Sequence, residues 1–140
     1  MLEDKYSHLK LSVIHGDYKY VLFKDLNDYI QASRTIIEQI KDQPYSIFCT
    51  TKEYSAIIPG ELELNSLVVS EVNNWSCFQI VGEMPFGTVS GLIATITSAL
   101  KESKIGVCVV STYKTDLFFI KTQNLSLAIS TLKDTGWDFL

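Results

Sequence analysis

The chain has 140 residues, a formal net charge of −4 and a hydrophobic fraction of 46%. This length suits one compact domain or two very small ones, and the composition is ordinary for a soluble globular protein. Arg34 is the only arginine, so we do not expect the basic face of a nucleic-acid binder. The sequence has no apolar run long enough to span a membrane and no signal-peptide pattern at its N-terminus. We therefore predict a cytoplasmic protein.

Two strands and an amphipathic helix open the predicted structure. Residues 10–14 and 19–23 favour strands, with a turn at residues 15–17. From residue 26 to residue 40 the apolar side chains recur at helical spacing. Asp25 is a suitable N-cap, and Pro44 limits how far the helix can run.

Short strands follow this helix at residues 45–49 and 54–58, and Pro59-Gly60 ends the second. Residues 61–69 favour an extended segment in which Glu61 and Glu63 alternate with leucines, and we interpret this glutamate face as solvated. Residues 71–74 have the composition of a connector.

The second half predicts a strand at 75–81, a glycine-bounded loop at 82–87 and a helix at 88–101, capped by Thr88 or Ser90. Strands at 107–110 and 117–120 follow, then a helix at 124–134 capped by Asn124, and a short strand at 137–140. The order βαββαβ favours an α+β, ferredoxin-like fold with two helices on one face of an antiparallel sheet.

An internal repeat links the two halves. Residues 48–58 align without gaps on residues 110–120, with Thr50 opposite Thr112 and Lys52 opposite Lys114. In each half the aligned strands follow the long helix. We therefore interpret the chain as two related units, an abbreviated one at residues 1–70 and a complete one at residues 71–140.

A polar segment, Ser111-Thr112-Tyr113-Lys114-Thr115-Asp116, separates the two apolar strands of the second half. It fits either a plain β-turn or a site for a small polar ligand. Cys49, Cys77 and Cys108 each lie in an apolar run, so we expect three buried reduced thiols; their spacing suits no metal site. No nucleophile–base pair or metal set can be placed, so we expect no enzyme.

These segments resemble a known family. A strand–STYxTD–strand segment, here at residues 111–116, and a glycine–Phe loop before an apolar helix, here at residues 82–87, are similar to tandem ACT domains of the amino-acid-sensing kind. The chain resembles the small stand-alone bacterial members related to CASTOR-type arginine sensors. The resemblance implies ferredoxin-like ACT units in tandem and a non-catalytic regulatory protein that binds an amino acid between ACT units, without cofactor or metal.

The resemblance also implies a site at the helix N-terminus and the adjoining strand ends. A helix N-terminus presents unpaired N–H groups to a carboxylate, and Asp116 would take an ammonium group. Met84 and Phe86 fit packing at an ACT–ACT interface better than contact with the ligand. We expect a homodimer, and a ligand-free interaction module that uses the ACT fold as a dimerisation scaffold is the alternative function. The implied ligand-binding residues are Met84, Phe86, Gly87, Thr88, Ser111, Thr112, Tyr113 and Asp116.

Overall fold

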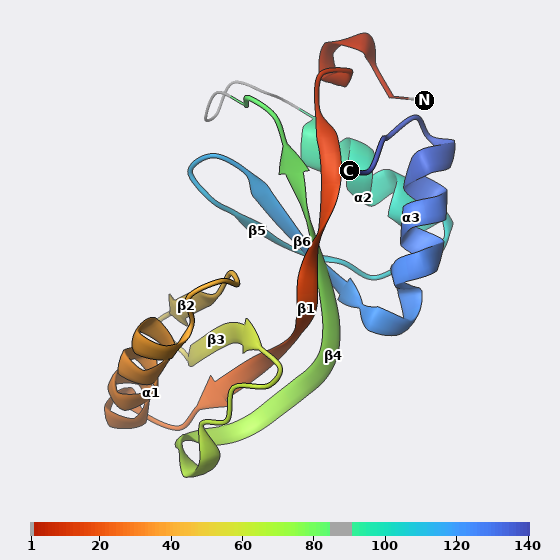
Figure 1. The fold of residues 1–140 in the computed structure, drawn as a ribbon. Helices are drawn as coiled ribbons and strands as arrows, with labels where there is room; N and C mark the ends of the chain where they lie inside the picture. Colours follow the sequence, from red (N-terminus) through yellow and green to blue (C-terminus); the bar gives the residue numbers. More distant parts are fainter. Residues whose placement is uncertain (1, 85–90) are drawn as a thin grey trace. The chain divides into compact units, whose positions relative to one another are not determined.

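The computed structural model describes residues 2–84 and 91–140 (Figure 1). Hydrogen bonds join the described strands in the order β2-β3-β1-β4-β6-β5. By contacts the chain divides into two compact units, His15–Trp75 on one side and Met1–Ile14 with Ser76–Leu140 on the other. The helices and strands are β1 (Lys10–Phe23), α1 (Leu26–Gln39), β2 (Ser46–Cys49), β3 (Tyr54–Pro59), β4 (Val68–Val81), α2 (Leu92–Glu102), β5 (Cys108–Ser111), β6 (Asp116–Lys121) and α3 (Leu125–Asp134).

The His15–Trp75 unit contains one long helix and the strand order β2-β3-β1-β4. Helix α1 begins as predicted, because the Asp25 carboxylate accepts a hydrogen bond from the Asp28 N–H at 2.9 Å. A 3-10 helix, Asn65–Leu67, stands between β3 and β4, where the sequence leaves little room for a second α-helix. The core of this unit joins α1 to the sheet and consists of Val21, Phe23, Ala32, Ile36, Ala56, Ile58 and Leu64.

Strands β1 and β4 are longer than the sequence predicted. The expected turn at residues 15–17 lies inside β1, and the expected connector at residues 71–74 lies inside β4, so both predictions were wrong. Gly16 (φ +98°) and Asn74 (φ 66°) have left-handed backbone conformations. These two turn-forming residues therefore make the backbone irregular within each strand, but they do not end it.

The other unit packs α2 and α3 together on one face of its strands, with the order β1-β4-β6-β5 (Figure 1). The rings of Phe78 and Phe118 stack in its core with centroids 5.0 Å apart. Leu9 and Leu11 are fully buried in the same core. The start of the chain thus belongs with the C-terminal half, which differs from the division at residue 70 that the sequence suggested.

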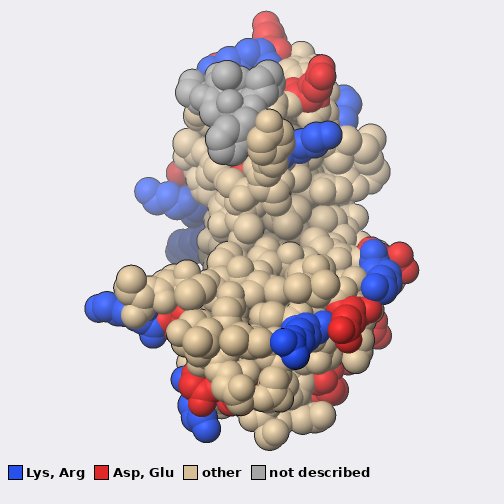
Figure 2. Space-filling view, turned by 90° about the vertical axis from the view of Figure 1, so that its left-hand side faces the viewer, with Lys and Arg blue, Asp and Glu red and all other residues tan. Residues whose placement is uncertain are grey.

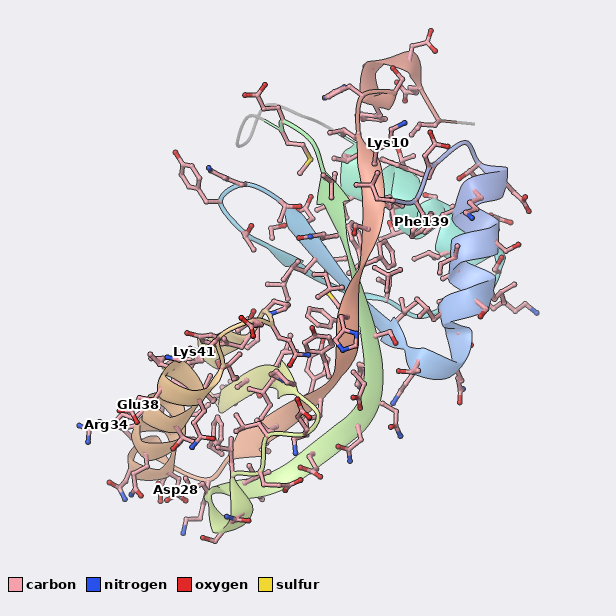
Figure 3. All side chains as sticks on the ribbon, in the orientation of Figure 1. Lys10, Asp28, Arg34, Glu38, Lys41 and Phe139 are labelled. Carbon is pink, nitrogen blue, oxygen red and sulfur yellow. The ribbon has the colours of Figure 1, made fainter. Side chains whose placement is uncertain are left out.

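The C-terminal segment forms less structure than expected. Helix α3 ends at Asp134, as predicted, and Gly136 just beyond it has a φ of +107°. Residues 137–140 form no strand; a single parallel bridge pairs Leu11 with Phe139, and Figure 3 shows Phe139 close to β1 and Lys10. Trp137 is buried nonetheless. Backbone hydrogen bonds also hold this segment: the Leu11 N–H donates to the Asp138 carbonyl and the Leu140 N–H to the Leu11 carbonyl, both at 2.8 Å.

Candidate functional site

The polar segment between β5 and β6 is a closed hairpin turn. Ser111 pairs with Asp116 across the strands. The Thr112 N–H donates to the Thr115 carbonyl at 2.7 Å, and the Thr115 N–H donates to the Thr112 hydroxyl at 3.1 Å. The Ser111 hydroxyl donates to the Asp116 carboxylate at 2.6 Å. Hydroxyl groups therefore hold the turn and position the carboxylate.

The turn is anchored next to the end of β4. The Thr115 hydroxyl donates to the Ile80 carbonyl at 2.6 Å, two residues before Gly82. Beyond this anchor the turn faces solvent: Thr112 is exposed, and 79% of Tyr113 is exposed. Asp116 is half-buried. The turn thus offers a carboxylate held on one side by Ser111 and an exposed aromatic ring, a combination that suits a small cationic or hydroxylated group.

The sequence-predicted residues are only partly brought together. Ser111, Thr112, Tyr113 and Asp116 share one hairpin, whereas the side chain of Met84 packs against the core of the C-terminal unit. Three further predicted ligand residues, Phe86, Gly87 and Thr88, lie outside the described residues, as does the cap Ser90. Gly91 stands at the N-cap of α2 with φ 78°.

The hairpin β2–β3 repeats this turn in the other unit. Cys49 pairs with Tyr54 just as Ser111 pairs with Asp116. The Thr50 N–H donates to the Glu53 carbonyl at 3.0 Å, and the Thr50 hydroxyl accepts the N–H groups of Lys52 and Glu53, both at 3.1 Å. The predicted repeat of the two hairpins is confirmed in register and in its threonine-capped turn.

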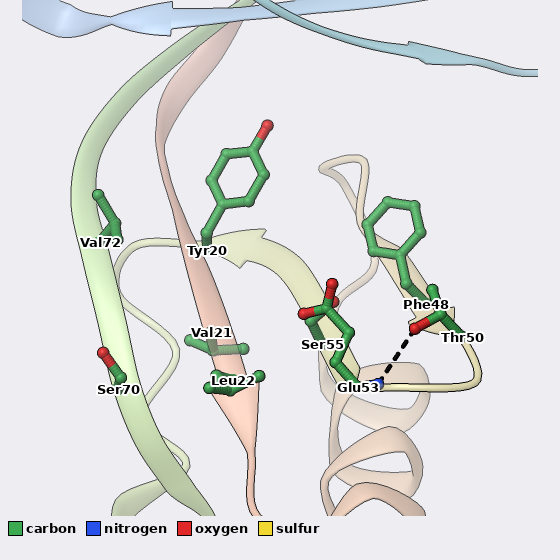
Figure 4. A pocket seen from close by; sticks show the side chains of 9 residues that line it. All are labelled: Tyr20, Val21, Leu22, Phe48, Thr50, Glu53, Ser55, Ser70 and Val72. Carbon is green, nitrogen blue, oxygen red and sulfur yellow. Dashed lines mark hydrogen bonds between the residues drawn. The ribbon is translucent and has the colours of Figure 1, made fainter.

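A hollow lies beside the Thr50 turn in the His15–Trp75 unit. It has a volume of about 470 Å³ and includes Thr50 and Glu53 in its lining (Figure 4). A second hollow of about 480 Å³ lies in the same unit near the C-terminus of α1, beside Lys41 and Glu61. The internal repeat pointed to the Thr50 turn, because it aligned Thr50 with Thr112. The hollow could not be predicted from the sequence, because side chains from β1 and β4 also line it.

The prediction of three buried thiols needs correction. Cys77 alone is buried, and burial raises the pKa of its thiol to about 12; Cys49 and Cys108 are exposed because they lie on the edge strands β2 and β5. The glutamate face is exposed, as interpreted: Glu61 and Glu63 are both exposed. The Glu63 carboxylate also lies 3.8 Å from the ammonium of Lys19, a buried lysine that the sequence pattern did not reveal. Within the described residues no cluster of His, Cys, Asp or Glu could hold a metal ion.

Surface charge and helix length add two observations. On the described surface that Figure 2 shows, basic and acidic side chains are interspersed without a large region of one sign. None of the helices in residues 2–84 and 91–140 is long and apolar enough to span a membrane.

Comparison with known proteins identifies the fold. Residues 70–134 match the family model of the ACT domain. No curated protein matches the sequence. The solved structure of a protein from Agrobacterium tumefaciens is 22% identical, with a TM-score of 0.74 over 95% of this chain and 92% of that one. A protein of unknown function from Vibrio cholerae is 18% identical, with a TM-score of 0.67 over 91% and 90%.

A third similar structure is the regulatory subunit of aspartate kinase from Thermus thermophilus in its ligand-free form. It is 9% identical, with a TM-score of 0.67 over 90% of this chain and 97% of that subunit. The described chain is therefore a mixed α+β protein with an antiparallel sheet and an ACT-like fold, as predicted, and it is similar over its length to a regulatory subunit.

Proposed function

We propose that this protein is a non-catalytic, cytoplasmic sensor that binds an amino acid where ACT units meet, within one chain or between two. The observation that carries the proposal is the ACT domain match at residues 70–134, which includes a hairpin turn with a positioned carboxylate. Similarity to a regulatory subunit of aspartate kinase supports a regulatory role, and ligand binding would act by favouring one packing of the units.

The turn supplies the chemistry for one end of an amino acid. The Asp116 carboxylate accepts one hydrogen bond from Ser111, and a carboxylate has capacity for several more, so it can receive a ligand ammonium. Thr112 and Tyr113 lie on the same exposed turn and would contact the rest of the ligand. The ligand carboxylate would bind at the N-terminus of α2, together with Phe86, Gly87 and Thr88.

The alternative function is a ligand-free interaction module. The described strand order ends in β2 and β5, each with one hydrogen-bonded neighbour, and edge strands of this kind can pair with a second chain. A homodimer formed in this way would need no small molecule.

Calorimetric titration with each proteinogenic amino acid tests the proposal. We expect one amino acid to bind the unmodified protein. Asp116→Asn should weaken the binding of that amino acid at least about tenfold, because the ligand ammonium loses its charged partner. Asp134→Asn, which changes an exposed carboxylate on α3, should leave binding unchanged. Absence of binding across the panel, together with a stable dimer, would favour the interaction module instead.

A further inference from the structure

The sheet of the His15–Trp75 unit has one face covered by α1 and one that α1 leaves open. Val21 pairs with Ala56, and both belong to the core beneath α1. The next pair, Leu22 with Ser55, faces the opposite side because side chains alternate along strands. Leu22 is 37% exposed, so this open face retains apolar surface in contact with solvent.

A hollow of about 470 Å³ lies on the open face. Its walls include side chains from three strands: Tyr20 and Leu22 on β1, Phe48 on β2, and Val72 on β4. Tyr20 is itself supported by Trp75, with ring centroids 5.1 Å apart. The hollow thus has aromatic and aliphatic walls of a size that suits a small organic molecule.

One ionised group lines this hollow. Among its nine lining residues Glu53 is the only one that is charged at pH 7, and the others that are polar carry hydroxyl groups. The Thr50 hydroxyl accepts the Glu53 N–H at 3.1 Å, which fixes the backbone of Glu53. In the view of Figure 4 the Glu53 side chain points from its turn into the space between Tyr20 and Phe48.

We propose that this hollow is a second ligand site, for a small molecule with a protonated amine and an apolar body. The carboxylate of Glu53 would receive the ammonium group, and the faces of Tyr20 and Phe48 attract a cation as well as apolar surface. A carboxylate-bearing ligand is disfavoured, because no lysine, arginine or histidine lines the hollow. The site therefore differs in place and in ligand class from the amino-acid site proposed at residues 111–116.

Binding of 2-phenylethylamine to the full chain tests this proposal, followed by backbone amide NMR shifts, with 2-phenylethanol and 3-phenylpropionate as neutral and anionic probes of similar shape. We expect dissociation constants of about 1 mM or weaker for the amine, since Glu53 is exposed and its attraction is screened. The largest shifts should fall at residues 50–55 and 70–72. The alcohol should bind more weakly, and the acid should not bind there.

Matched variants separate the carboxylate from the apolar walls. Glu53→Gln should weaken amine binding at least about fivefold and leave binding of the alcohol unchanged. Glu38→Gln, which removes an exposed carboxylate on α1 (labelled in Figure 3), should change neither. Phe48→Ala should weaken the binding of both the amine and the alcohol.

Three results would overturn the proposal. The first is equal binding of the amine and the acid. The second is a set of amine-induced shifts outside residues 20–22, 46–55 and 70–75. The third is a dimer by sedimentation that Val72→Asp dissociates, because a second copy would then occupy the open face. Amino-acid-induced shifts at residues 111–116 are a separate readout, so either proposed site can fail without the other.

Discussion

The Lys19 ammonium lies 3.4 Å from the Glu71 carboxylate, although only 3% of the Lys19 side chain is exposed. Lys19 pairs with Ile58, a core residue, and so points to the side of the sheet that α1 covers. Glu63 lies farther away, at 3.8 Å, and is 72% exposed. A buried ammonium needs an ionic partner, and Glu71 on β4 is the nearer of the two.

Replacement of the two members of this pair should have unequal effects. Glu71→Gln leaves the buried ammonium with a neutral partner, and we expect it to lower the free energy of unfolding by about 1–2 kcal/mol, less than for a fully buried pair because Glu71 is 40% exposed. Lys19→Met keeps a long unbranched side chain without the charge, and it should lower the free energy of unfolding by less than Glu71→Gln does. Urea denaturation measures both values.

The double variant provides the control. Once Lys19 is methionine, Glu71→Gln should have almost no further effect, because there is no longer a buried charge to compensate. An unchanged cost of Glu71→Gln in the Lys19→Met background would contradict the ionic interpretation and point to Glu71 acting through strand β4 alone.

Thr112 should contribute to stability through its turn. Thr112→Ala removes the hydroxyl that accepts the Thr115 N–H and donates to the Thr115 carbonyl. We expect the free energy of unfolding to fall by about 1 kcal/mol. Thr112→Ser keeps the hydroxyl and should retain most of the stability of the unmodified protein. Lys114→Ala is the control in the same exposed turn. Equal effects of the alanine changes at residues 112 and 114 would show that the hydroxyl is unimportant.

The repeat makes the same prediction for Thr50. Its hydroxyl accepts two backbone N–H groups, so Thr50→Ala should also lower the free energy of unfolding by about 1 kcal/mol. Thr51→Ala, a change at the neighbouring exposed residue, should have little effect. Thermal denaturation of the two variants provides the comparison, and equal melting temperatures would contradict the prediction.

Local patterns explain which parts of this fold could be predicted. The α1 helix has apolar spacing and an aspartate cap, and both hairpins have short apolar strands around polar turns. Strands β1 and β4 could not be delimited, because Gly16 and Asn74 carry the signals of turns while the hydrogen-bonded strands continue through them. Propensity reports local backbone preference, and the partner strands determine whether a strand ends there.

The candidate site was predictable to a similar extent. The polar turn at residues 111–116 could be located, because its hydroxyls and carboxylate are adjacent in the sequence. The open-face hollow could not, because Tyr20, Phe48 and Val72 come from three strands. Lys19 was missed for the same reason, since its partner Glu71 lies 52 positions away by residue number.

The three cysteines should differ in reactivity. A thiol reagent such as dithionitrobenzoate should modify the exposed Cys49 and Cys108 in the native protein and leave Cys77 intact. Burial raises the pKa of Cys77 to about 12, so an increase of the pH to 9 should not generate its thiolate. Mass spectrometry locates the modified residues. Rapid native labelling of Cys77 in a Cys49→Ser/Cys108→Ser variant would contradict its burial.

Asp138 should titrate below the ordinary range of an aspartate. The Lys10 ammonium donates to its carboxylate at 2.7 Å, and this hydrogen bond, with the attraction of the charge, lowers the pKa of Asp138. The folded state therefore gains stability from the pair above the unfolded pKa of about 3.9. That gain is lost as the pH falls through the lower folded pKa. Carboxyl-carbon NMR of Asp138 follows the titration directly.

Two lysine variants test the cause of this shift. Lys10→Met should return the pKa of Asp138 towards its ordinary value, whereas Lys133→Met should raise it much less, because Lys133 acts only through its charge and is the smallest contributor. The C-terminal segment should also loosen in Lys10→Met, visible as faster amide exchange at Leu140, whose N–H donates to the Leu11 carbonyl at 2.8 Å. An unshifted Asp138 pKa in Lys10→Met would show that the pair does not persist in solution.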